Sequence, residues 1–220
     1  MKELSHIKRV FILCILTSVC IVSINTSIFA VSEAAVMFLR ISPSPLANGM
    51  GETYGNIASN DPMASIFNPA YLGFFSKKQN FGFSYSKANW LPGLTSDLFY
   101  KCFSFNFGYS FKNTPITIGM GYHHIYLDLG KQIGMDEMGN PTVGFESSEN
   151  ANIFAFSALF DYYILASIGF SYKFIESNLA QFGAVSEKGS GDASANALDL
   201  GLSIKVPLFD ILSKINNSPI

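Results

Sequence analysis

The 220-residue chain is poor in charged residues and in cysteine. Charged side chains make up 14% of it, against about a quarter in soluble domains, and the formal net charge is −2. A chain without a basic surface has no strong electrostatic attraction for nucleic acid, so we expect no nucleic-acid partner. Cys102 is the only cysteine after residue 20, which excludes an internal disulfide and a cysteine-based metal cluster from residues 21–220.

The sequence also lacks the motifs of familiar catalytic and metal sites. It has no glycine-rich phosphate loop, no metal-binding histidine pair and no nucleophile elbow. His123 and His124 are adjacent, so on a strand they point to opposite faces and do not bind one metal together. Ser104 or Ser110 with His123 would be the one conceivable pair of nucleophile and base. The residues therefore favour a protein that is not an enzyme and needs no cofactor or metal.

Residues 1–30 have the pattern of an export signal peptide. Basic residues near the start are followed by an apolar run at residues 10–22 and a candidate cleavage site at residues 27–30. The apolar run is short for a bilayer span and has the length of a signal-peptide core. A lipoprotein cut before Cys20 is the alternative, but Val19 is bulkier than the residue preferred there.

Aromatic residues make up 15% of the chain and follow a strand pattern. Between residues 99 and 111 almost every second side chain is aromatic, and the intervening ones are small and mostly polar. Side chains alternate across a strand with a period of two, so one face of this strand is a wall of rings. A soluble sandwich also buries such a wall, but there it is more often aliphatic. Serine, glycine and asparagine opposite the rings favour lipid on one side and a wet lumen on the other.

Five further runs alternate in the same way, which predicts six antiparallel membrane strands between residues 77 and 207 and a tail at residues 208–220. The predicted strands cover residues 81–86, 99–111, 116–126, 152–160, 166–174 and 197–206. Their polar positions are expected to face the lumen, and they include Ser104, Asn106, Lys173, Asp199 and Lys205. A lysine on the lipid face near the bilayer midplane costs about 2–4 kcal/mol, so charges confined to the polar positions support this assignment.

The predicted connections alternate in length. Short turns at residues 112–115 and 161–163 alternate with long loops around Trp90, at residues 129–150 and at residues 177–192. Outer-membrane barrels arrange their periplasmic turns and outer loops in this way. The loop at residues 129–150 lacks the ligand spacing of a calcium loop, so we expect a solvated surface there. Its acidic residues are Asp136, Glu137, Glu146 and Glu149.

Residues 36–76 do not alternate, and residues 31–76 are expected to form a compact segment ahead of the sheet. Asp61 followed by Pro62 is a good N-cap and first-turn pair, so a short helix is predicted to start there. Asn68 before Pro69 is predicted to end it, because a proline disfavours the helical conformation of the residue before it.

The N-terminal region resembles a known family. The motifs are FLRI at residues 38–41, Gly49 and Gly51, Asp61, and the Asn68, Pro69 and Ala70 triplet. Together with the run at residues 197–202 they resemble the FadL-like superfamily of outer-membrane fatty-acid transporters, most closely its PorV/PorQ branch. The resemblance implies an all-β fold, an antiparallel outer-membrane β-barrel in which residues 31–76 form a hatch. The motif residues would then gate the hatch, the two glycines by permitting a close backbone approach or a positive φ.

The resemblance also implies a function and partners. The expected function is to bind or transport hydrophobic small molecules such as long-chain fatty acids, in contact with membrane lipid. The alternative is a scaffold without transport activity, such as a PorV-like component of a secretion system with protein partners.

Six strands are fewer than such barrels contain. An open sheet in a bilayer leaves unpaired backbone groups, each of which costs several kcal/mol. Three explanations follow: the chain is a truncated, non-functional piece of a barrel, other chains complete the barrel, or it never inserts. Truncation is the favoured explanation.

Overall fold

The computed structural model describes residues 36–52, 61–89, 91–93, 97–136, 138–162, 164–179 and 191–206. Contacts divide the chain into residues 1–35 and 36–220, and every described residue belongs to the second unit. The predicted signal peptide at residues 1–30 and the predicted tail at residues 208–220 lie outside the described residues. Within the described residues, no helix has the length and apolar character needed to cross a membrane.

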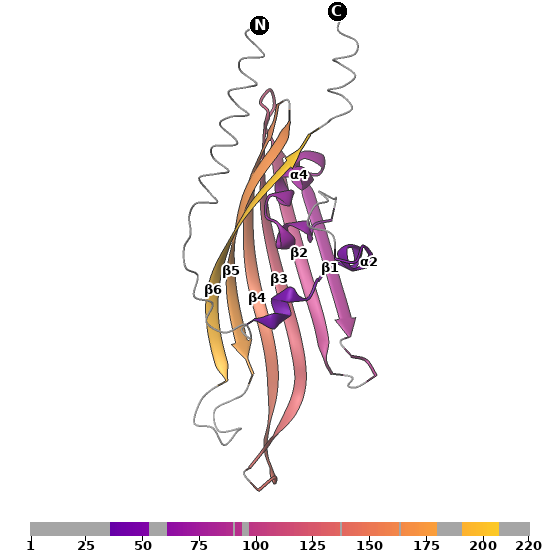
Figure 1. The fold of residues 1–220 in the computed structure, drawn as a ribbon, viewed down its shortest axis with the longest axis vertical. Coiled ribbons are helices and arrows are strands. Elements are labelled where there is room, and N and C mark those ends of the chain that lie inside the picture. Colours follow the sequence, from indigo (N-terminus) through magenta and orange to yellow (C-terminus); the bar gives the residue numbers. More distant parts are fainter. Residues whose placement is uncertain are drawn as a thin grey trace, which may run out of the picture. The chain divides into compact units, whose positions relative to one another are not determined.

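The prediction of an antiparallel, six-stranded sheet is confirmed. The strands are β1 (Phe81–Asn89), β2 (Phe99–Ser110), β3 (Ile116–Met135), β4 (Pro141–Asp161), β5 (Leu165–Asn178) and β6 (Asp192–Lys205). Each strand pairs with the next along the chain, in the order β1-β2-β3-β4-β5-β6 (Figure 1). Among the described residues β1 and β6 do not pair with each other, so the sheet does not close into a barrel.

The two faces of the sheet differ as the alternation predicts. The outer face carries the rings, and many of them are exposed, including Phe83 at 56% and Phe107 at 49%. These rings contact each other across strands, as in the pairs Phe81–Phe105 and Phe156–Phe170, whose centroids lie 5.0 and 5.1 Å apart. The inner face carries serine, glycine and asparagine together with apolar side chains such as Ile125, Ile153 and Leu159, and most of them are buried.

The N-terminal segment, described at residues 36–52 and 61–78, covers the inner face (Figure 1). It contains η1 (Met37–Arg40), α2 (Pro45–Gly49), α3 (Ala64–Phe67) and α4 (Tyr71–Lys78). Apolar side chains of the segment pack on the sheet in three clusters. The largest joins Phe38 and Met63 of the segment to Ile125 and Ile153 of the sheet. Burying such a side chain contributes about 1.5–3 kcal/mol, so these clusters hold the segment in place.

Two predictions about the helices of this region are wrong. The single short helix expected from Asp61 begins at Ala64, and α4 follows it and extends to Lys78. The first strand begins at Phe81, as the alternation at residues 81–86 predicts. The predicted end of the first helix is correct, because Asn68 has extended dihedral angles, with φ −148° and ψ 111°.

The prediction of a long loop at residues 129–150 is also wrong. β3 and β4 continue through most of it as a paired hairpin, with register shifts between Asp128 and Lys131 and between Ile133 and Met135. The turn is confined to residues 136–140, so the expected alternation of long and short loops does not hold here. The shifts change which side chains face outward, and this hides the strand's alternation in the sequence.

Candidate functional site: the interface between the N-terminal segment and the sheet

Polar side chains of the inner face bind the backbone of the N-terminal segment. Four of them donate hydrogen bonds to its carbonyl oxygens. These bonds run from Ser86 to Pro43 at 2.7 Å, from Tyr100 to Ile41 at 3.0 Å, from Asn106 to Pro62 at 2.8 Å and from Ser167 to Ala70 at 2.7 Å. A buried carbonyl group without a partner is costly, and this explains why the covered face is rich in small donors and poor in charge.

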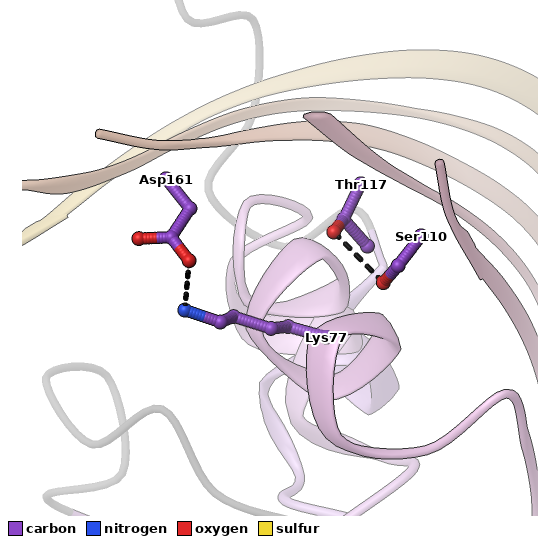
Figure 2. A network of polar contacts seen from close by, with 4 residues as sticks. All are labelled: Lys77, Ser110, Thr117 and Asp161. Atoms are coloured by element: carbon purple, nitrogen blue, oxygen red, sulfur yellow. Dashed lines mark hydrogen bonds and ion pairs between the residues drawn. The ribbon is translucent and has the colours of Figure 1, made fainter. Parts of the chain in front are cut away.

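His123 joins the segment to two strands. It is fully buried, its Nε2 atom lies 2.9 Å from the Ser65 hydroxyl of α3, and its Nδ1 atom lies 2.8 Å from the Ser104 hydroxyl of β2. The sequence thus anticipated the approach of Ser104 to His123 but missed Ser65. Ser110 is elsewhere and bonds to Thr117 at 2.9 Å (Figure 2). Because each ring nitrogen of His123 is hydrogen-bonded to a serine hydroxyl, one on α3 and one on β2, His123 holds α3 against the sheet.

Ser65→Ala is expected to lower the free energy of unfolding by about 1–2 kcal/mol, because it leaves the Nε2 atom of His123 buried without a partner. Urea denaturation measures this loss. Ser194→Ala is the control, because Ser194 is exposed on β6 and its loss should change stability by less than about 0.5 kcal/mol. Equal losses in the two variants would show that the contact between Ser65 and His123 contributes nothing specific.

The 68–70 segment lies against two facing glycines of β5 and β6. Gly169 and Gly201 pair directly in the sheet. A Cβ atom added to Gly169 would lie 2.5 Å from the Ala70 amide nitrogen and 2.6 Å from the Pro69 carbonyl oxygen. A Cβ atom added to Gly201 would lie 3.0 Å from the Ala70 amide nitrogen and also clash with Asn68 Oδ1. Only glycine therefore lets the segment approach the sheet this closely.

Asn68 fixes the turn that makes this approach. Its Oδ1 atom accepts a hydrogen bond from the Ala70 amide at 3.0 Å, and its Nδ2 atom donates one to the Leu202 carbonyl oxygen of β6 at 3.4 Å. Sequence reasoning singled out Asn68, Pro69 and Ala70, and the structure places them together on β5 and β6. Their role in gating remains a prediction.

The two glycines belong to a row of small residues that sequence reasoning missed. Successive register partners across five strands are Gly108, Gly119, Ser157, Gly169 and Gly201. Helix α4 and the 68–70 segment lie along this row, since added Cβ atoms would meet α4 at the first two positions and the 68–70 segment at the last two. Each member occupies a polar position of its own strand, but only the register of the strands places the five side by side.

In the described part of the chain, two buried hydroxyl groups, one in this row and one on α4 against it, have no hydrogen-bond partner. Within the described residues, the Oγ atoms of Ser76 in α4 and Ser157 in β4 have no hydrogen-bond partner. Both would contact a Cβ atom at Gly119, at 2.5 and 2.9 Å. An unpaired buried hydroxyl costs about 1–3 kcal/mol, so α4 packs on the sheet less stably than an all-apolar contact would.

Ser76→Ala is expected to raise the free energy of unfolding by about 1 kcal/mol, because it removes a desolvated hydroxyl without opening a large cavity. Amide hydrogen exchange in α4, compared between variant and parent, measures the change locally. Ser157→Ala tests the same idea on a strand, where the helix propensity of alanine does not contribute. Faster exchange of α4 in both variants would contradict the expectation.

The charged residues predicted to face the lumen lie at the margin of this interface. Lys173 and Asp199 form an ion pair at 2.7 Å, and the Ser171 hydroxyl donates a hydrogen bond to Asp199 at 3.1 Å. Lys205 lies exposed at the end of β6. A second ion pair, between Lys77 of α4 and Asp161 of β4, ties the end of α4 to the sheet (Figure 2).

The remaining predicted residues lie at the start of the N-terminal segment. Gly51 has a positive φ of +65°, as expected. For Gly49 the expectation of a positive φ or a close backbone approach is wrong. Gly49 ends α2, and no atom lies within 4 Å of a Cβ added to it. The Asp61 carboxylate accepts hydrogen bonds from the Met63 amide at 2.9 Å and the Ser44 hydroxyl at 2.6 Å, and so joins α2 to the turn before α3.

No site for a metal follows from the described residues, since no group of three histidine, cysteine, aspartate or glutamate residues among them could hold one. Glu137, one of the four acidic loop residues, lies outside the described residues. No protein-family model and no curated protein sequence matches this chain.

Proposed function

We propose that this chain forms part of an outer-membrane β-barrel wall, with its aromatic face in lipid and its N-terminal segment as a hatch. The exposed apolar face of the sheet carries the proposal. It is built from phenylalanine, tyrosine and leucine, whereas the covered face holds serine, glycine and asparagine together with buried apolar side chains such as Ile125 and Ile153. A soluble sheet buries its apolar face, and exposing one this large in water favours aggregation.

The height of the apolar band supports this proposal. On β3 the outward side chains run from Ile116 to Tyr126, and at the level of Tyr126 the outward side chains of β2 and β5 are charged, at Lys101 and Glu176. Residues 116–126 match the roughly 9–11 residues with which a tilted strand crosses the hydrocarbon core.

The open edges of β1 and β6 require partners in such a setting. An unpaired backbone group in hydrocarbon costs several kcal/mol, so a stable barrel needs further strands on both edges. Strands of other chains, or of a longer chain, would supply them. The outward side chains of β6 are among the most exposed apolar groups described, with Leu200 at 80%.

The hatch and its ligand form the second part of the proposal. The 68–70 segment lies directly on the β5–β6 wall, and its displacement would uncover Gly169 and Gly201. A passage opened there would adjoin both the lipid face and the inner face, which suits a hydrophobic small molecule. The resemblance of the N-terminal motifs to fatty-acid transporters points to long-chain fatty acids as the ligand class.

Expression of the chain with its first 30 residues, followed by membrane fractionation and gel analysis of heat-modifiability, tests the location. A protease-resistant species in the outer membrane, folded before heating, is the expected result. Soluble or aggregated periplasmic material would contradict it. Binding of a radiolabelled long-chain fatty acid to this species then tests the ligand class, with Asn68→Ala as the hatch variant and Ser110→Ala as its control.

One observation favours a second candidate function, that of a scaffold without transport activity. The β3–β4 hairpin extends beyond the neighbouring strands (Figure 1). Its end exposes apolar side chains. Fatty-acid binding unaffected by Asn68→Ala, together with binding of a protein partner, would favour this candidate.

A further inference from the structure

The hairpin tip, residues 131–146, lies outside the part of the sheet that the N-terminal segment covers. It follows the register shift after Asp128, and β3 and β4 pair only with each other there. An exposed ion pair between Lys131 and Glu146, at 3.6 Å, marks its base. The tip is therefore a two-stranded extension with both faces open.

The turn of the tip is held in one shape by Asp136. Its carboxylate accepts hydrogen bonds from the Met138 and Asn140 amides at 2.9 and 2.7 Å, and from the Asn140 side chain at 2.9 Å. These bonds lower the pKa of Asp136, those from Asn140 most strongly. Gly139 completes the turn with a φ of +80°. A preformed turn loses little conformational freedom on binding, which favours affinity.

The hairpin tip presents apolar side chains to solvent, both from the turn and from the two strands. Met138 is 89% exposed, and Ile133, Met135 and Val143 are 63%, 53% and 66% exposed. Single exposed apolar residues are ordinary, but four of them on one short hairpin are a local concentration, and exposed apolar surface is common at protein-binding sites. Methionine in particular adapts to pockets of irregular shape.

The charge around the patch indicates what covers it. Residues 131–146 contain three acidic residues and one lysine, so this short hairpin carries as large a negative balance, −2, as the whole 220-residue chain. Such a surface is repelled by anionic lipid headgroups and by a second copy of itself. It complements an apolar pocket with a rim of lysine or arginine.

We propose that the hairpin tip is a docking site for a partner protein, with Met138 as the anchor in an apolar pocket and the acidic residues facing a basic rim. The site lies apart from the hatch, so it does not depend on ligand passage.

Fluorescent peptides with one apolar core, flanked by lysine, serine or glutamate, test this proposal on the full chain. The lysine-flanked peptide is expected to bind best, and Met138→Ser to weaken it at least about tenfold, as for an interface anchor. Glu146→Lys is expected to weaken it less and to reduce its salt dependence. Ile164→Ser, at the opposite end of β4, is the matched control and is expected to bind as the parent does.

Several outcomes would overturn the proposal. Equal binding of the three peptides, or binding of none, would show that the tip has no affinity for a basic apolar surface. Binding to vesicles of phosphatidylcholine and phosphatidylglycerol that Met138→Ser abolishes would make the tip a membrane anchor. Self-association in analytical ultracentrifugation that the same variant abolishes would make the occupant a second copy.

Discussion

Gly169→Ala is expected to displace the 68–70 segment from the sheet and to lower the free energy of unfolding by about 3 kcal/mol, the upper end of ordinary overpacking. The atoms that a Cβ would meet belong to the backbone of Pro69 and Ala70. Backbone atoms cannot rotate away as the end of a side chain can, so the whole segment must move. That movement would also strain the hydrogen bond from Ser167 to the Ala70 carbonyl oxygen.

Two measurements check this expectation. Urea denaturation gives the loss of stability, and limited proteolysis shows whether the N-terminal segment becomes accessible while the sheet persists. Gly144→Ala is the control, since it is also a strand glycine and an added Cβ meets only the Gln132 carbonyl oxygen at an ordinary 3.6 Å. If both variants were equally stable and equally resistant to protease, the close contact at Gly169 would not determine how the segment packs.

The alternation of side chains was enough to predict the sheet, because each strand shows its two faces within its own sequence. Between residues 99 and 111 the rings alternate without help from any neighbour, and β2 spans almost the same residues. The hairpin tip shows where this reasoning stops. A register shift exchanges the faces after Asp128, and the charged residues that follow resemble a loop.

The helices of the N-terminal segment were harder to predict, because their stability comes from contact with the sheet. Helix α4 has eight residues, fewer than an isolated helix needs in water. Gly73 within it weakens the local preference further. An added Cβ there would clash with the Ser167 side chain, so this glycine serves packing that only the folded structure reveals.

The candidate site was predictable only in part for the same reason. Ser104 and Asn106 were placed on the polar face from their position in one strand, and both are buried there. Asn106 bonds to the Pro62 carbonyl group, and Ser104 is linked to Ser65 only through His123. These residues of the N-terminal segment are far away in sequence. The row of glycines could not be recognised until the register of five strands was known, because each glycine alone is unremarkable in a strand.

Phe170→Lys is expected to destabilise the protein in lipid by about 2–4 kcal/mol, because Phe170 lies in the middle of the apolar band and a charge there must leave water. In water the same change would remove an exposed ring and alter stability by less than about 0.5 kcal/mol. Urea unfolding in phosphatidylcholine vesicles shows which of these two losses of stability occurs.

Two control variants separate the charge from the ring. Phe170→Leu removes the ring contact with Phe156 without adding charge, and Ile133→Lys adds a charge beyond the band. A large loss in Phe170→Lys alone would place the aromatic face in lipid, whereas three equally small losses would mean that this face never contacts hydrocarbon, and the membrane proposal would fall with it.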